Sequence, residues 1–189
     1  MAGVARHAPG NLILIGYRGC GKTAVGRELA ARLGRPFMDT DEQIVAREGH
    51  SIREIFQQRG EAAFRAAETR VLEQVLTSPA PADRRVISVG GGAVLSDENR
   101  RRLKAAGVCI WLTAPPEELH RRLLADPVTA ANRPALTERD ALTEIRHLLA
   151  VRGPLYAAIA DHIVETAGRS VADVVNLIVG LLEPPSPHG

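Results

Sequence analysis

Residues 12–23 read LILIGYRGCGKT, an apolar run followed by a glycine-rich turn that closes on Lys22 and Thr23. The apolar run predicts a buried strand. After Thr23 the apolar residues Val25, Leu29 and Leu33 recur at helical spacing, so the glycines join a strand to a helix. This context is typical of a phosphate-binding loop, whose backbone N–H groups point at phosphate oxygens beside a helix N-terminus. We expect Lys22 to reach the β- and γ-phosphates of a nucleotide and Thr23 to hold Mg²⁺. The chain has 22 arginines and two lysines, and one of the lysines stands here.

Length and charge limit what the chain can be. Its 189 residues fit one domain, 1–189, since domains typically run to about 100–200 residues. The 24 basic and 22 acidic side chains are well mixed and give a net charge of +2, which lacks the electrostatic footprint of a nucleic-acid binder. The densest basic run, 100–102, has no aromatic neighbours and fits a solvated helix face better than a binding stripe. We therefore expect no nucleic-acid partner.

The cysteines and the apolar runs indicate a compartment. Cys20 and Cys109 stand far apart in the sequence, which is not the spacing of a disulfide or a metal site. Two such unpaired cysteines favour the reducing cytoplasm. Cys109 fits a small buried hydrophobe, and Cys20 fits either a neutral spacer or a thiol acidified by the helix N-terminus. No signal peptide and no membrane-spanning run is present, and the six histidines lack metal-ligand spacing. We expect a soluble, cytoplasmic protein with no membrane partner.

Strand-like and helix-like segments alternate along the chain. Strands are expected at 12–15, from 37 to an end in 39–41, and at 86–89, 108–112 and 162–165. Helices are expected from the glycine loop to residue 33, over much of 41–78 with an interruption at Gly60, near 97–106, from 116, from about 137 to 152, and over 171–182. This alternation predicts an α/β fold of three layers, α/β/α, with a five-stranded parallel sheet and ligands at the carboxyl ends of the strands.

Four parts of the single domain are expected to differ in character. The core covers about 11–182, and an insertion of about 41–78 separates two strands. The segment 126–136 is small, polar and contains proline, which suits a mobile lid. The proline-rich tail, 183–189, is expected to be disordered.

Six sequence blocks in this order resemble the shikimate kinase family, within the nucleoside-monophosphate-kinase-like group of P-loop kinases. They are residues 16–23, Asp39-Thr40-Asp41, Phe64-Arg65-Ala66-Ala67-Glu68, Gly90-Gly91-Gly92, Arg133-Pro134 with Leu136, and Arg152-Gly153-Pro154-Leu155-Tyr156. The resemblance covers nearly the whole chain. It implies that the γ-phosphoryl group of ATP passes, with Mg²⁺, to the 3-hydroxyl of shikimate, a step of chorismate and aromatic amino-acid synthesis.

The same resemblance assigns residues to the nucleotide side of the site. It implies that ATP is bound by Gly19, Cys20, Gly21, Lys22, Thr23, Ala24, Arg122, Arg133 and Arg169. In this assignment Arg133 closes with the lid onto the transferred phosphoryl group, and Arg122 stacks against adenine. Thr23 binds Mg²⁺ directly and Asp39 meets it through water. The catalytic residues are then Lys22, Asp41 and Arg133.

On the acceptor side, Asp39 and Asp41 are expected to project the same way from a strand end, because they stand two residues apart. By resemblance Asp41 binds the acceptor hydroxyls and orients or deprotonates the attacking one. Arg65 and Arg152 would grip a carboxylate as bidentate forks. The turn formed by Gly90, Gly91 and Gly92 would approach the substrate closely. Glu68, three residues after Arg65, would hold the arginine in place.

Structural alternatives remain open for each of these residues. Asp41 could be only the N-cap of the next helix, each arginine could be a surface ion pair, and the glycine triplet could be a flexible turn.

Two other functional classes also remain open. Gluconate and nucleotide kinases share the loop, although the blocks around Asp41, Arg65 and the glycine triplet argue against them. A P-loop nucleotide switch would normally carry an aspartate at the end of the strand 86–89, and this strand has none. Such a compact single domain is most simply a monomer.

Overall fold

Five parallel strands form the centre of the protein in the computed structural model, which describes residues 10–77, 84–125 and 138–182. The strand order is β2-β3-β1-β4-β5. The strands are β1 (Asn11–Ile15), β2 (Phe37–Asp39), β3 (Val86–Ser88), β4 (Gly107–Thr113) and β5 (His162–Glu165). Every residue of β1 is buried, as expected for the central strand of a sheet covered on both faces. The predicted fold class is confirmed.

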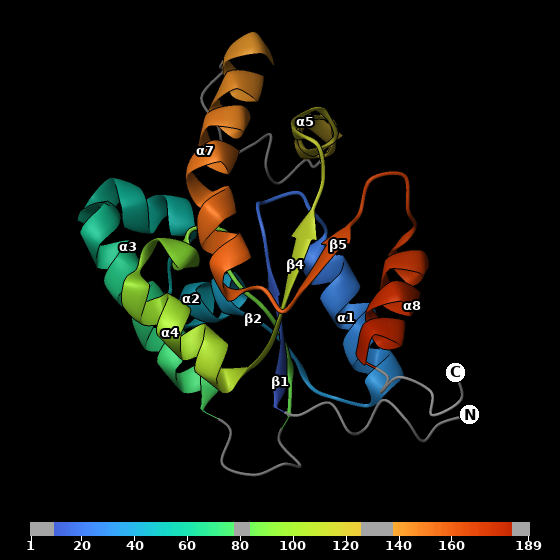
Figure 1. Ribbon diagram of the computed structural model, residues 1–189. Helices are drawn as coiled ribbons and strands as arrows, with labels where there is room; N and C mark the ends of the chain where they lie inside the picture. Colours follow the sequence, from blue (N-terminus) through green and yellow to red (C-terminus); the bar gives the residue numbers. More distant parts are fainter. Residues whose placement is uncertain (1–9, 78–83, 126–137, 183–189) are drawn as a thin grey trace, which may run out of the picture.

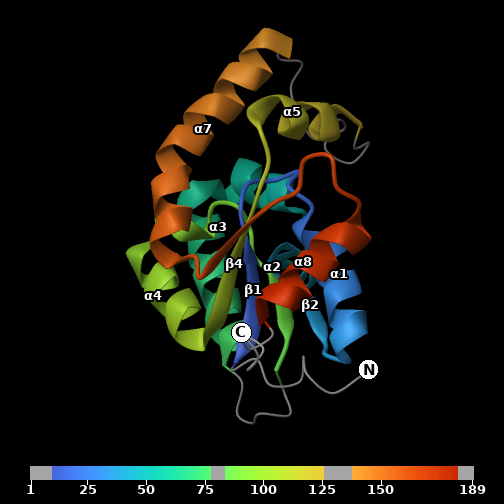
Figure 2. The same cartoon turned by 45° about the vertical axis from the view of Figure 1, so that its right-hand side comes forward.

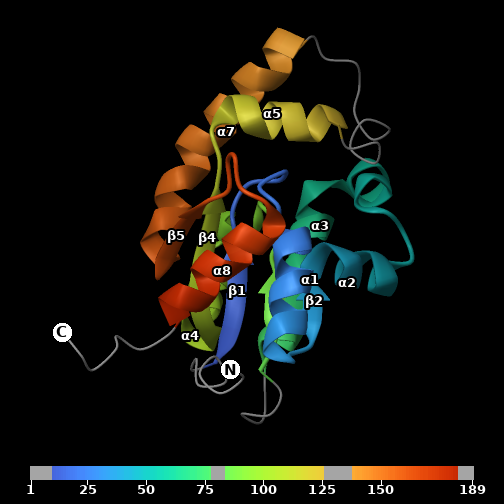
Figure 3. The same cartoon turned by 90° about the vertical axis from the view of Figure 1, so that its right-hand side faces the viewer.

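Helices cover both faces of this sheet (Figure 1). On one face lie α1 (Lys22–Leu33) and α8 (Val171–Leu182), and on the other lie α3 (Ile52–Leu76) and α4 (Asp97–Ala106), with α2 (Thr40–Glu48) beside α3. Figures 2 and 3 show α5 (Pro116–Ala125) and the far half of α7 (Glu138–Ile159) standing beyond the carboxyl ends of the strands. The end of the sheet where the sequence predicts ligands therefore faces these two helices.

Alternate residues of β1 face two hydrophobic cores. Leu12 and Leu14 pack with α1, α5 and α8, whereas Ile13 and Ile15 pack with α2, α3, α4 and the end of α7. This alternation is the period of two that a strand requires. The two cores hold the end of β1, and so the glycine loop, in a fixed position.

Two local predictions are wrong. First, α7 does not end near Arg152 but continues through Pro154 to Ile159. Proline removes one helical hydrogen bond, but Tyr156 and Ile159 beyond it are buried in the core, and this packing outweighs the local preference. Second, Asp39 ends β2 while Asp41 lies in the first turn of α2, so the two carboxylates do not project from one strand.

Other local predictions are confirmed. The bounds of β5 and α8 are those expected, and Ser51 and Glu54 form a capping box. Gly60 interrupts α3 with φ of 77°. Cys109 is buried in β4, as expected for a small hydrophobe. Burial raises the pKa of its thiol to about 12, so the thiol stays neutral.

The ends of the chain and two internal segments, 1–9, 78–83, 126–137 and 183–189, lie outside the described residues. The expected lid with Arg133 and the expected disordered tail fall within them. In the rest of the chain no helix has the length and apolar character needed to span a membrane.

Candidate active site

The loop between β1 and α1 wraps around the Lys22 ammonium. Lys22 Nζ donates to the carbonyl oxygens of Gly16 at 2.9 Å and Tyr17 at 3.0 Å, and the side chain is buried. Gly21, the N-cap of α1, has φ of 95°, which L side chains rarely adopt. A Cβ on Gly16 would lie 2.2 Å from the Leu112 carbonyl oxygen. The loop is thus a tight turn at a helix N-terminus that carries the positive charge of Lys22, which makes it a suitable cradle for an anion.

Thr23 and Asp39 place two oxygen donors beside this cradle. The Thr23 hydroxyl donates to Asp39 Oδ2 at 2.8 Å, and Asp39 Oδ1 accepts from the backbone N–H of Asp41 at 3.0 Å. Asp39 is therefore the N-cap of α2, the role that sequence analysis left open for Asp41. A hydroxyl and a carboxylate are the oxygen ligands that Mg²⁺ prefers, so this pair fits a magnesium ion.

Asp41 faces the glycine turn that follows β3. A Cβ on Gly90 would lie 2.6 Å from Asp41 Oδ1, so only glycine leaves room for this carboxylate. Burial and the neighbouring Asp39 raise the pKa of Asp41, whereas Lys22 and Arg65 act against that rise. The pKa of this carboxyl group at the edge of the phosphate cradle is therefore shifted upward, the direction that favours accepting a proton.

Arg65 reaches the same turn from α3. Its Nη1 donates to Glu68 Oε2 at 2.8 Å, and Glu68 is 1% exposed. A Cβ on Gly92 would lie 2.5 Å from Arg65 Nη1. Glu68 thus fixes the guanidinium against the backbone of the turn.

Arg152 reaches the same turn from α7, far from Arg65 in the sequence. Its Nη1 donates to the Gly91 carbonyl oxygen at 3.3 Å, and its buried Nε has no hydrogen-bond partner among the described residues. Tyr156, one turn along α7, donates to the same carbonyl oxygen. The fold therefore gathers Asp41, Arg65 and Arg152 around the Gly90–Gly92 turn, an arrangement that can hold a small anion with hydroxyl groups.

A hollow of about 500 Å³ opens between the phosphate loop, α5 and the β5–α8 loop. Its lining includes Gly19, Cys20, Gly21, Arg122, Thr166 and Arg169. Arg122 donates to Thr166 Oγ1 and to the Thr166 carbonyl oxygen, both at 2.9 Å, and to the Gly19 carbonyl oxygen at 3.3 Å. Arg122 thus holds α5, the β5–α8 loop and the phosphate loop together.

Glu118 keeps Arg122 in this orientation. Its carboxylate accepts from Arg122 Nε at 2.7 Å. Hydrogen bonds from Arg121 and Arg122 lower the pKa of Glu118 to about 2, so the carboxylate stays ionised.

Cys20 is buried under the loop with its Sγ 3.8 Å from Lys22 Nζ, and Ala24 is exposed in the first turn of α1.

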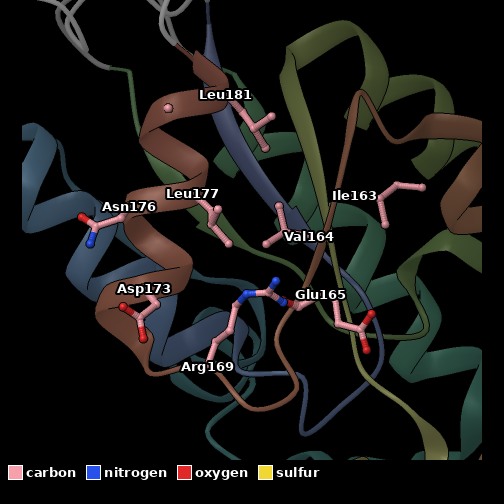
Figure 4. Close-up of a pocket in the computed structure, with 9 residues that line it drawn as sticks. Ile163, Val164, Glu165, Arg169, Asp173, Asn176, Leu177 and Leu181 are labelled. Carbon is pink, nitrogen blue, oxygen red and sulfur yellow. The ribbon is translucent and has the colours of Figure 1, made fainter.

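Arg169 also lines a separate hollow of about 750 Å³ on the outer edge of the sheet. Figure 4 shows Val164, Leu177 and Leu181 turned toward it, with Arg169 at its end beside Glu165. Arg169 Nη1 donates to the Glu165 carbonyl oxygen at 2.8 Å. This hollow is mostly apolar and contains none of the phosphate-loop residues.

Sequence reasoning missed three side chains of the site: Thr40, Tyr156 and Thr166. Thr40 is fully buried and its Oγ1 accepts from the backbone N–H of Gly90 at 3.0 Å. Thr40 and Tyr156 stood within the quoted blocks, but Thr166 carried no sequence signal, because its role depends on a tertiary contact with Arg122. No group of three or more histidine, cysteine, aspartate or glutamate side chains suited to a metal occurs in the described part of the chain.

Comparison with known proteins places this geometry in context. Residues 18–183 match the family model described as shikimate kinase. A shikimate kinase of Symbiobacterium thermophilum is 43% identical over 179 residues, which cover 95% of this chain and 99% of that protein. Among solved structures, the shikimate kinase from Acinetobacter baumannii in complex with shikimate superimposes with a TM-score of 0.81 at 36% identity, covering 92% of each chain. A gluconokinase from Sinorhizobium meliloti gives a TM-score of 0.61 at 18% identity, over 92% of this chain and 91% of that one, a likeness of fold alone.

Proposed function

This chain belongs to the shikimate kinase family, and we propose that it carries out the family's reaction with the residues described above. It transfers the γ-phosphoryl group of ATP to the 3-hydroxyl of shikimate and yields ADP and shikimate 3-phosphate. The observation that carries this proposal is the convergence of the phosphate loop, Asp41 and two arginines on one glycine turn.

The acceptor side explains the choice of a carboxylated ring. Arg65 and Arg152 approach the Gly90–Gly92 turn from two helices, and a pair of guanidinium forks binds a carboxylate with both charge and direction. With the carboxylate held there, the ring hydroxyls face Asp41. Asp41 orients the attacking hydroxyl and accepts its proton as the oxygen bonds to the γ-phosphorus and the bond to the β,γ-bridging oxygen breaks.

The nucleotide side supplies charge and position. The triphosphate lies along the phosphate loop, where Lys22 exchanges its carbonyl partners for phosphate oxygens. Thr23 would hold Mg²⁺, with Asp39 meeting it through water, and the ion neutralises charge on the β- and γ-phosphates when it is bound. The nucleoside lies in the hollow of Arg122 and Arg169. Arg133, outside the described residues, contacts the transferred group.

Purified protein with ATP and Mg²⁺ tests the proposal against its closest rivals. ADP release should rise with shikimate, less with quinate and not with gluconate, and mass spectrometry should find shikimate 3-phosphate. Lys22→Ala should abolish transfer, Asp41→Asn should lower kcat by about a hundredfold to ten-thousandfold, and Arg152→Ala should mainly raise the KM for shikimate. Equal ADP release with gluconate, or release that needs a protein partner instead, would exclude this function.

The setting of the enzyme is part of the same proposal. The net charge of +2 and the cysteine pattern support a cytoplasmic enzyme that works without nucleic acid or membrane, and a single domain of this size supports a monomer. Size-exclusion chromatography with light scattering at micromolar concentration tests the monomer, and a dimer would contradict it.

A further inference from the structure

The peptide bond between Tyr17 and Arg18 lies between the two halves of the site. Its carbonyl oxygen accepts from Lys22 Nζ at 3.0 Å, on the phosphate side. Its N–H nitrogen lies 3.5 Å from the place of a Cβ on Gly91, on the acceptor side. Lys22 is expected to touch the γ-phosphate and Gly91 lies in the acceptor turn, so the Arg18 side chain starts from the path along which the phosphoryl group travels.

The Arg18 guanidinium is held there by weak contacts. It lies 3.6 Å from Glu144 Oε1 on α7, and the two side chains are 43% and 40% exposed. It also lies over the Tyr17 ring, 5.6 Å from its centroid. An ion pair between two such exposed side chains contributes little to stability, because water competes for both charges. Arg18 can therefore exchange Glu144 for a better partner at little cost.

The Tyr17 ring also contacts a second arginine. The ring is 2% exposed, and the Arg152 guanidinium lies 6.0 Å from its centroid. One buried ring thus contacts the arginine of the phosphate loop and the arginine of the acceptor turn. Each guanidinium lies within 6.0 Å of the same ring centroid, so a phosphoryl group between the loop and the turn would be attracted by two positive charges.

We propose that Arg18 is a further phosphoryl-binding residue of this enzyme, which leaves Glu144 and contacts the γ-phosphate of bound ATP. The inference rests on the proposed function, since it needs ATP on the phosphate loop. A guanidinium binds a doubly charged phosphate through charge-assisted hydrogen bonds that a single carboxylate at 3.6 Å does not match.

Binding measurements without acceptor test this directly. The dissociation constants of ADP and of the non-hydrolysable β,γ-imido analogue of ATP are measured by calorimetry for the wild type, Arg18→Ala, Arg18→Lys and Glu144→Gln. Arg18→Ala should weaken the analogue by about tenfold to a hundredfold, the loss expected for one hydrogen bond to a charged group, and leave ADP within about twofold. Arg18→Lys should recover part of the loss, and Glu144→Gln should tighten the analogue.

Arg146→Ala is the matched control. Arg146 lies on the same helix as Glu144 and pairs with Glu117 at 2.6 Å, with both side chains exposed. It should change neither constant. Equal weakening of ADP and analogue by Arg18→Ala, no weakening of either, or weakening of the analogue by Glu144→Gln would overturn the proposal. A wild type that binds the analogue but releases no ADP with shikimate would instead contradict the proposed function.

Discussion

The hydroxyl of Thr23 and the carboxylate of Asp39 share a hydrogen bond of 2.8 Å that joins the first turn of α1 to the end of β2. The two residues come from different β–α units, so only the parallel sheet brings them together. The same carboxylate caps α2 through the backbone N–H of Asp41. One side chain thus connects the expected magnesium site to the residue expected to accept the proton.

Replacing Asp39 separates these two roles. Asp39→Asn keeps a good N-cap but removes the charge, so the melting temperature should barely change. The Mg²⁺ concentration for half-maximal activity should rise by about tenfold to a hundredfold, the usual effect of losing an outer-shell partner. Asp39→Ala also loses the cap, so it should unfold at lower denaturant concentration, by about 1 kcal/mol. A magnesium titration of Asp39→Asn that overlays the wild type would count against the site.

Asp41→Asn should lower activity and raise stability together. Burial beside Asp39 raises the pKa of Asp41 above the value of 3.8 that the unfolded chain has. Between those two values the native state binds more protons than the unfolded state, so stability falls as pH rises through that window. Above it, the wild type retains the full cost of the buried charge, and the asparagine variant does not.

Melting curves across pH check this for the ligand-free protein. Asp41→Asn should melt above the wild type at neutral pH, and the difference should vanish below about pH 3.8, where both states of the wild type are protonated. Its kcat should fall by about a hundredfold to ten-thousandfold, as for loss of a general base. The acid limb of the wild-type kcat/KM profile should have an apparent pKa above 3.8. A less stable Asp41→Asn at neutral pH would contradict the raised pKa.

Much of the fold was predictable because it depends on local periodicity. The apolar run of β1 and the apolar residues at helical spacing in α8 are the residues that the core buries, and both segments fold as expected. Pro154 shows the limit of such reasoning. A local rule ends the helix there, but burial of Tyr156 and Ile159 carries α7 past the proline, and no local pattern reports a tertiary contact.

The candidate site divides in the same way. The phosphate loop could be derived from residues 12–23 alone, because strand, glycines and lysine are contiguous. The pairing of Arg65 with Arg152 followed from family resemblance, since nothing in their spacing brings two distant helices to one turn. Thr166 could not have been found, because its partner Arg122 meets it only across the folded structure.

Gly92→Ala should weaken acceptor binding without unfolding the protein. Gly92 has φ of −96°, which alanine adopts, but its Cβ would lie 2.5 Å from Arg65 Nη1, the end of a flexible side chain. The guanidinium must move, so the KM for shikimate should rise by about tenfold, the loss of one hydrogen bond to a charged group. The KM for ATP should not change. Steady-state kinetics with each substrate varied in turn give both constants.

Gly153→Ala is the control for that substitution. Gly153 lies inside α7 next to Arg152, and a Cβ there meets nothing within 4 Å. Alanine should stabilise the protein by about 0.5–1 kcal/mol through its helix propensity and leave both KM values unchanged. If Gly153→Ala raised the KM for shikimate as much as Gly92→Ala, proximity to the site alone would explain the effect.

Thr40 offers the sharpest test of how the two strand ends are joined. Its fully buried hydroxyl oxygen accepts from the Gly90 N–H at 3.0 Å, and Gly90 in turn leaves room for Asp41. Thr40→Val has nearly the same shape but leaves that N–H buried and unpaired, which should cost about 1–3 kcal/mol in chemical unfolding. Thr40→Ser keeps the acceptor and should lose less stability than Thr40→Val. Because Gly90 then moves relative to Asp41, kcat should fall in Thr40→Val and remain near the wild-type value in Thr40→Ser. Equal kcat in the two variants would show that the hydrogen bond serves the fold and not the placement of Asp41.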